Sequence, residues 1–210
     1  MKSIYVALLI TIFILFSNCI VVKEKDEIIK KEIEYETEYI PAQKSKIKMS
    51  DKIVRTEHGD MVASIPDGWF FIEPEGTISS EVFAIAVSPN FTLSAVFSRI
   101  KKTNEIIDIV DKEGIIGLAR ASYSKHTTKN FNATIIVDNY HIYDSNSQDF
   151  VVYSYTKLKR NTFGKSAVFI SSINEYYEFS LVTMDFTSND TPTTSQFDDI
   201  FYSILTTLKY

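Results

Sequence analysis

The sequence predicts an α+β fold, an antiparallel β-sheet with flanking helices, and three observations support it. Residues 133–185 hold four β-rich runs separated by short polar turns, the pattern of an antiparallel meander. From about Pro192 to Leu208, apolar residues recur at helical spacing and form one continuous stripe, which suits a helix lying flat on a sheet. A third segment, between Thr103 and Ser124, also has helical spacing.

The predicted strands fall into three groups. The meander strands are Thr134–Tyr143, Asp149–Leu158, Lys165–Ile173 and Tyr176–Met184. An earlier hairpin is predicted from Lys52–Glu57 and Asp60–Ile65, which flank His58-Gly59. Val82–Ser88 and Phe91–Ile100 form a further pair.

Two features of the predicted helices leave alternatives open. Gly114 and Gly117 each weaken the middle helix by ~1 kcal/mol relative to Ala. They let it press closely on the sheet, or they split it in two. The last helix starts with Thr191 as a cap before Pro192, or with a capping box of Ser195 and Asp198.

The length, composition and charge of the chain exclude several classes of protein. A chain of 210 residues, 45% hydrophobic and with 15 Phe and 12 Tyr, can fill the core of one domain with appendages. The net charge of −5 and the lack of a basic block argue against a nucleic-acid partner. The single cysteine excludes an intramolecular disulfide, a multi-cysteine zinc cage and a CxxC redox pair.

The N-terminus predicts export and lipidation. Lys2 precedes an apolar run from Ile4 to Phe16, which as a helix spans ~20 Å, less than the ~30 Å hydrocarbon core of a bilayer. It therefore fits a signal peptide over residues 1–18. Leu15–Cys19 resembles a bacterial lipobox, in which cleavage before the cysteine accompanies acylation of its sulfur. Cys19 is the predicted lipidation site.

The alternative at the N-terminus is an uncleaved anchor, because Ile20–Val22 extend the apolar stretch. Under either interpretation the rest of the chain leaves the cytoplasm and stays on a membrane of the bacterial cell envelope. Ile20, in place of the Asp associated with inner-membrane retention, favours the outer membrane.

A charged tether is predicted over residues 19–50, followed by a globular domain over 51–210. Within the tether, Glu32, Glu34, Glu36 and Glu38 alternate with less polar residues. A period of two suits an added edge strand, whereas the charge density suits a solvated spacer. Pro41 and the Lys-rich stretch after it favour the spacer.

The segment Ser64–Phe71 predicts a strand, a turn at Pro66-Asp67-Gly68 and then the one tryptophan, Trp69. Trp69 is either a ligand-stacking platform or a core anchor that pins the turn onto the sheet. We favour the core anchor, because aromatic side chains dominate core energetics.

Here the chain resembles the PsbP-like superfamily, which includes bacterial lipoproteins of the DcrB type. The resemblance spans about residues 52–208 and rests on the hairpin ending Ile65-Pro66-Asp67-Gly68-Trp69, the strand pair, the middle helix, the meander and the terminal helix with Phe197–Ser203. It implies an αβα sandwich and mostly non-catalytic adaptor roles. It supplies no catalytic residues, and the superfamily's metal and GTPase contacts have no matching motif here.

The sequence predicts no enzyme, cofactor or metal site. His58, His126 and His141 lack the spacing of paired metal ligands. The acidic loop from Asp144 to Asp149 lacks the Gly and Glu that an EF-hand requires and reads as a polar hairpin loop. No nucleophile elbow, phosphate loop or dinucleotide fingerprint occurs.

One strand offers a candidate partner surface. In Asp149–Leu158, Tyr153 and Tyr155 share a face with Val151 and Lys157. If helices cover only the other face, these tyrosines form an exposed aromatic patch for a partner. If a sandwich covers both faces, they belong to the core.

These observations predict a non-catalytic, membrane-tethered envelope lipoprotein that binds a protein or envelope component. A second hypothesis is a small-molecule or ion carrier with a pocket between sheet and helix. A third is an enzyme whose site is assembled only in space.

Overall fold

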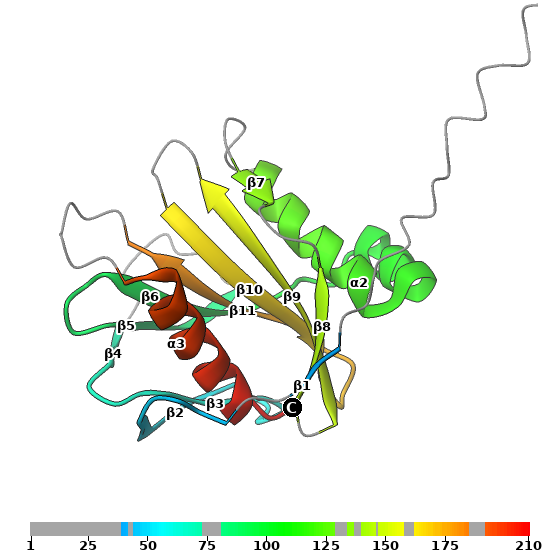
Figure 1. Cartoon of the computed structure of the whole chain (residues 1–210). Helices are drawn as coiled ribbons and strands as arrows, with labels where there is room; N and C mark the ends of the chain where they lie inside the picture. Colours follow the sequence, from blue (N-terminus) through cyan, green and yellow to red (C-terminus); the bar gives the residue numbers. More distant parts are fainter. Residues whose placement is uncertain are drawn as a thin grey trace, which may run out of the picture. The chain divides into compact units, whose positions relative to one another are not determined.

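The structure is a computed structural model that describes residues 39–41, 44–72, 81–128, 134–136, 140–145, 147–157, 162–184 and 192–210. Its main feature is a nine-stranded sheet that carries helices on its faces (Figure 1). The predicted α+β class is confirmed. The predicted signal peptide, Cys19 and the alternating Glu32–Glu38 run lie outside the described residues.

The order of the sheet is β1-β8-β9-β10-β11-β6-β5-β4, with β7 also pairing to β9. The strands are β1 (Tyr39–Pro41), β4 (Phe70–Ile72), β5 (Val82–Val87), β6 (Leu93–Arg99), β7 (Thr134–Ile136), β8 (His141–Ser145), β9 (Gln148–Lys157), β10 (Thr162–Ile170) and β11 (Tyr176–Thr183). All pairs are antiparallel except β1 with β8. The meander is confirmed, although its predicted first strand divides into β7 and β8.

A separate two-stranded sheet pairs β2 (Met49–Arg55) with β3 (Val62–Pro66). Its turn contains Gly59 at φ 70°, whose amide donates to Thr56 O at 3.0 Å. Glycine adopts this left-handed conformation without steric cost. The predicted early hairpin is therefore confirmed.

The helix α2 (Asn104–Thr128) breaks at Gly114, where φ is 63° and ψ is −148°. Such angles are accessible essentially to glycine alone. The two halves approach closely at Gly117, since a Cβ there would lie 2.8 Å from Ile109 O. Of the two interpretations of these glycines, the split helix is the one observed.

Helix α2 covers the face of the sheet that carries Tyr153 and Tyr155. These tyrosines are 0% and 1% exposed and belong to a core cluster with Leu118 and Ala119 of α2. The two faces of β9 were predicted correctly. The prediction of an exposed aromatic patch at Tyr153 and Tyr155 is wrong, because a helix covers each face.

Helix α3 (Thr194–Thr207) covers the opposite face (Figure 1). Its Phe201 stacks on Phe179 at a centroid distance of 5.2 Å, and Phe179 stacks on Phe97 at 5.0 Å. The cap is neither Thr191 nor Ser195. Thr193 forms a capping box with Gln196, whose side chain and backbone complete both reciprocal hydrogen bonds.

The folded domain begins before the predicted boundary at Asp51. Tyr39–Pro41 adds the parallel edge strand β1 to β8. Lys46 Nζ contacts Asp199 Oδ1 at 2.7 Å, and Lys48 O accepts from Asp67 N at 2.9 Å. The last part of the predicted spacer is therefore built into the domain, where its backbone finds partners.

Among the described residues, no helix is both long and apolar enough to cross a membrane.

Candidate functional site

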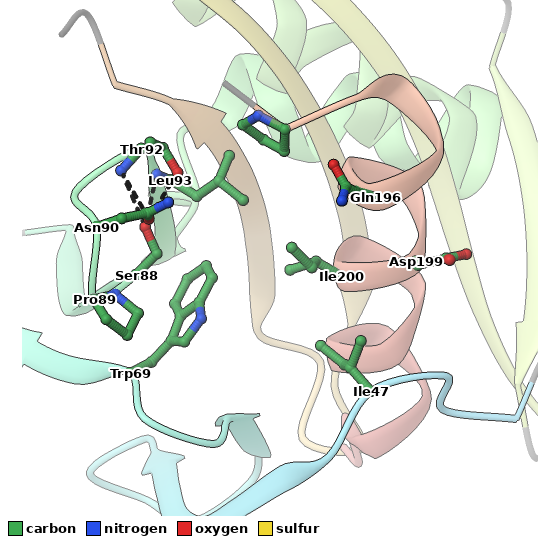
Figure 2. A pocket seen from close by; sticks show the side chains of 11 residues that line it. Ile47, Trp69, Ser88, Pro89, Asn90, Thr92, Leu93, Gln196, Asp199 and Ile200 are labelled. Carbon is green, nitrogen blue, oxygen red and sulfur yellow. Dashed lines mark hydrogen bonds between the residues drawn. The ribbon is translucent and has the colours of Figure 1, made fainter. Parts of the chain in front are cut away.

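A pocket of about 800 Å³ opens between the β5–β6 turn and helix α3. We call it the Trp69 pocket. Figure 2 shows the indole of Trp69 on one side and Ile200 of α3 on the other, with Ile47 below. Its volume lies within the range of about 300–1,000 Å³ that is usual for small-molecule sites.

Trp69 serves both the core and the pocket wall. The residue is 5% exposed and belongs to the core cluster under α3. Gly68 precedes it at φ 81°, and a Cβ at Gly68 would touch Pro89 Cγ at 3.6 Å. The core-anchor interpretation is confirmed, because the indole is buried in the core cluster, from which it also lines the pocket.

The wall on the Trp69 side continues into the β5–β6 turn, which is held by short side-chain hydrogen bonds (Figure 2). Ser88 Oγ accepts from Thr92 N at 3.1 Å and from Leu93 N at 2.9 Å. Asn90 Oδ1 accepts from Thr92 Oγ1 at 2.9 Å (Figure 2). With its oxygen engaged, Asn90 has its amide donors left for a ligand.

Helix α3 supplies the polar groups across the opening. Gln196 Oε1 accepts from Thr193 N at 2.9 Å as part of the helix cap, which leaves its amide N–H groups as donors. Asp199 is paired with Lys46 and points away from Trp69 (Figure 2). The pocket therefore combines apolar walls with the neutral donors of Asn90 and Gln196, and the Asp199 carboxylate in its lining is paired with Lys46.

Phe91, in the same turn, has an unusual backbone. Its φ is 58° although it is not glycine, and its ring is 50% exposed. The ring packs edge-on against Phe70 at 5.4 Å. Bulky residues in this region are strained, and such strain is concentrated at functional sites. Sequence patterns carry no signal for a positive φ at a phenylalanine.

The structure does not bring the three histidines together into a metal site. His58 lies in the β2–β3 turn, His141 opens β8, and His126 on α2 contacts Glu178 on β11 at 2.7 Å. In the described part of the chain, no three His, Cys, Asp or Glu side chains gather around a common point. The Asp144 loop is a hairpin turn in which Asp144 Oδ1 accepts from Ser147 N at 3.0 Å.

No protein-family profile matches the chain, and a search of curated protein sequences finds no match. Solved structures are similar to it. CyanoP, the PsbP protein of Synechocystis sp. PCC 6803, aligns with a TM-score of 0.53 at 15% identity, over 76% of this chain and 92% of CyanoP.

Two further structures align less well. LpqN, involved in cell envelope biogenesis of Mycobacterium tuberculosis, gives a TM-score of 0.43 at 15% identity, over 77% of this chain and 92% of LpqN. A protein from Bacteroides thetaiotaomicron gives 0.40 at 12% identity, over 75% of this chain and 47% of the other. The alignment with CyanoP confirms the predicted fold, and at this identity it shows the fold alone.

Proposed function

We propose that this chain, whose domain has a PsbP-like fold, is a non-catalytic lipoprotein of the bacterial cell envelope that binds a protein or envelope component. Acylation of Cys19 anchors the chain, and it is localised to the outer membrane. The lipobox-like Leu15–Cys19 after the apolar run supports the anchor. The binding site is the Trp69 pocket.

The Trp69 pocket is the observation that carries the binding role. Its two sides belong to rigid elements: a turn fixed by Ser88 and Asn90, and the capped helix α3. Apolar side chains with a few neutral donors suit recognition of a partner segment by apolar contact and hydrogen bonds. The half-exposed Phe91 extends the apolar surface on the turn side.

Site-specific photocrosslinking in the native envelope tests this role. A photoreactive amino acid replaces the exposed Pro89 on the pocket wall, or, as a matched control, the exposed Lys112 on α2. We expect a discrete crosslinked product from position 89 and none from position 112. No product from position 89, or the same product from both, would contradict the proposed site.

The pocket volume also favours a second candidate, a small-molecule carrier. A cavity of about 800 Å³ between sheet and helix has room for a drug-sized ligand. Native mass spectrometry of the chain extracted from its own membrane distinguishes the two. A constant added mass of small-molecule size, lost when Ile200→Trp fills the pocket, supports a carrier, whereas crosslinked protein supports the adaptor.

A further inference from the structure

A buried carboxylate lies under the C-terminal part of α2, on the face of the sheet opposite the Trp69 pocket. Glu178 of β11 is 7% exposed. Its Oε1 accepts from His126 Nε2 at 2.7 Å, from Ser166 Oγ at 2.8 Å, from Ser180 Oγ at 2.9 Å and from Tyr153 Oη at 3.3 Å. Four donors thus converge on one oxygen.

The other carboxylate oxygen of Glu178, Oε2, has different surroundings. Among the described residues, no donor bonds to Oε2, and Glu178 lines a separate pocket of about 240 Å³. We call it the Glu178 pocket. Oε2 is not among the fully buried side-chain atoms of the described residues that lack a partner, so it is open to this pocket and can accept a hydrogen bond from a ligand.

Among the described residues around this pocket, no Lys or Arg forms an ion pair with Glu178. Arg99 is paired with Glu175 at 2.8 Å, and Lys125 faces Glu81 at 3.5 Å. Within the described part of the chain, the ion-pair partner of Glu178 is His126, which carries charge only when protonated. Burial raises the pKa of Glu178, but attraction to His126 and hydrogen bonds from His126 and Ser166 outweigh it and lower the pKa to about 2.

The remaining walls define the size and character of a ligand. Val82, Val96 and Val182 line the pocket with apolar side chains. A water molecule occupies about 30 Å³ in the liquid, so 240 Å³ accommodates a small organic molecule. Arg99 and Lys125 also line the pocket, but each is already paired with another acid. The Glu178 carboxylate beside apolar walls is therefore complementary to a short aliphatic chain ending in a positive charge.

We propose that the Glu178 pocket binds a small aliphatic ligand carrying a protonated amine, with the ammonium group donating to Glu178 Oε2. The pocket shares no lining residue with the Trp69 pocket, so this site does not depend on the proposed adaptor function. The four donors on Oε1 orient the carboxylate before the ligand arrives, which lowers the entropic cost of binding.

Methyl NMR of the full chain in detergent, with labelled valines, tests this site. n-Butylammonium chloride is titrated near neutral pH, and n-butanol, of the same length but uncharged, is titrated in parallel. We expect saturable shifts of the Val82, Val96 and Val182 methyls with butylammonium. Glu178→Gln should weaken binding by about tenfold or more, the cost of losing a charged hydrogen bond.

The matched control is Glu57→Gln, which removes one exposed acid in the β2–β3 turn and should bind like the wild type. Equal shifts with butanol, or unchanged binding by Glu178→Gln, would overturn the proposal. If Glu178→Gln does not fold, Val96→Phe fills the pocket with Glu178 intact and must abolish binding. Butylammonium binding retained by a folded Val96→Phe variant would overturn the proposal as well.

Discussion

The contact between Tyr155 and Gly164 shows how one residue without a side chain allows a large one to be buried. These residues pair across β9 and β10, and a Cβ at Gly164 would lie 2.5 Å from Tyr155 Cζ. The tyrosine ring therefore covers the glycine. The predicted strand begins at Lys165 and leaves Gly164 in the turn before it, whereas Gly164 lies inside β10.

We predict that Gly164→Ala destabilises the domain by about 1–3 kcal/mol, the usual cost of overpacking. The unfolding free energy from urea denaturation measures this. In a Tyr155→Leu background the same substitution should cost much less, because the obstructing ring is gone. Equal costs in both backgrounds would show that the ring contact is not the cause.

A substitution at Phe91 should affect partner binding without affecting the stability of the domain. Phe91→Gly removes the half-exposed ring and relieves the strain at φ 58°. We expect the crosslinking yield from position 89 to fall, while the unfolding free energy stays within about 1 kcal/mol of wild type. Phe70→Leu, which removes the ring that supports Phe91, is the comparison. Wild-type crosslinking in Phe91→Gly would exclude Phe91 from the binding surface.

Glu178 makes stability depend on pH in acid. Its folded pKa of about 2 lies below the ordinary value of 4.5, so its contribution is present above about pH 4.5 and is lost as pH falls toward 2. Between about pH 5 and about pH 3 we expect roughly 2 kcal/mol less unfolding free energy from this group. Glu178→Gln should show a correspondingly smaller loss, and an unchanged pH slope would contradict this assignment.

At the scale of elements, the break in α2 depends on Gly114. Its φ of 63° and ψ of −148° suit glycine alone, although a Cβ there would have no neighbour within 4 Å. We predict that Gly114→Ala costs about 1–3 kcal/mol through backbone strain, measured by urea denaturation. If the variant gains helicity by circular dichroism at unchanged stability, the break is not required for the packing of α2.

The elements were predictable where periodicity is strong. The apolar stripe of α3, with Phe197, Phe201 and Ile204 buried, and the alternation of β9 identified both elements and their faces. The added edge strand was considered near β1, but Pro41 favoured a spacer there. The strand β4 was missed, since three residues carry no periodicity. The sheet order was not predictable, because β11 pairs with β6 across a long stretch of chain.

The candidate site was less predictable than the fold. Trp69 was correctly interpreted as a core anchor, but the pocket beside it depends on the distance between the β5–β6 turn and α3, which no local pattern encodes. Tyr153 and Tyr155 were assigned to the right face, yet their burial depends on where α2 lies. No sequence pattern indicated the buried cluster around Glu178, because its partners Ser166, His126 and Tyr153 come from three different elements.

At the scale of the whole molecule, the proposed arrangement combines an export segment over residues 1–18, the single cysteine Cys19 and a domain with a PsbP-like fold. Lys46 and Lys48 fix the start of the domain to α3 and to the Asp67 turn. In the proposed arrangement, the remaining chain between Cys19 and Tyr39 is the link to the membrane. The proposed attachment to the membrane therefore depends on the chemistry of Cys19.

Metabolic labelling with radioactive palmitate, comparing wild type with Cys19→Ser, tests the proposed anchor most directly. We expect a labelled wild-type chain in the membrane fraction and no label on the Cys19→Ser variant. An unlabelled wild-type chain, or label retained by Cys19→Ser, would contradict lipid attachment at Cys19.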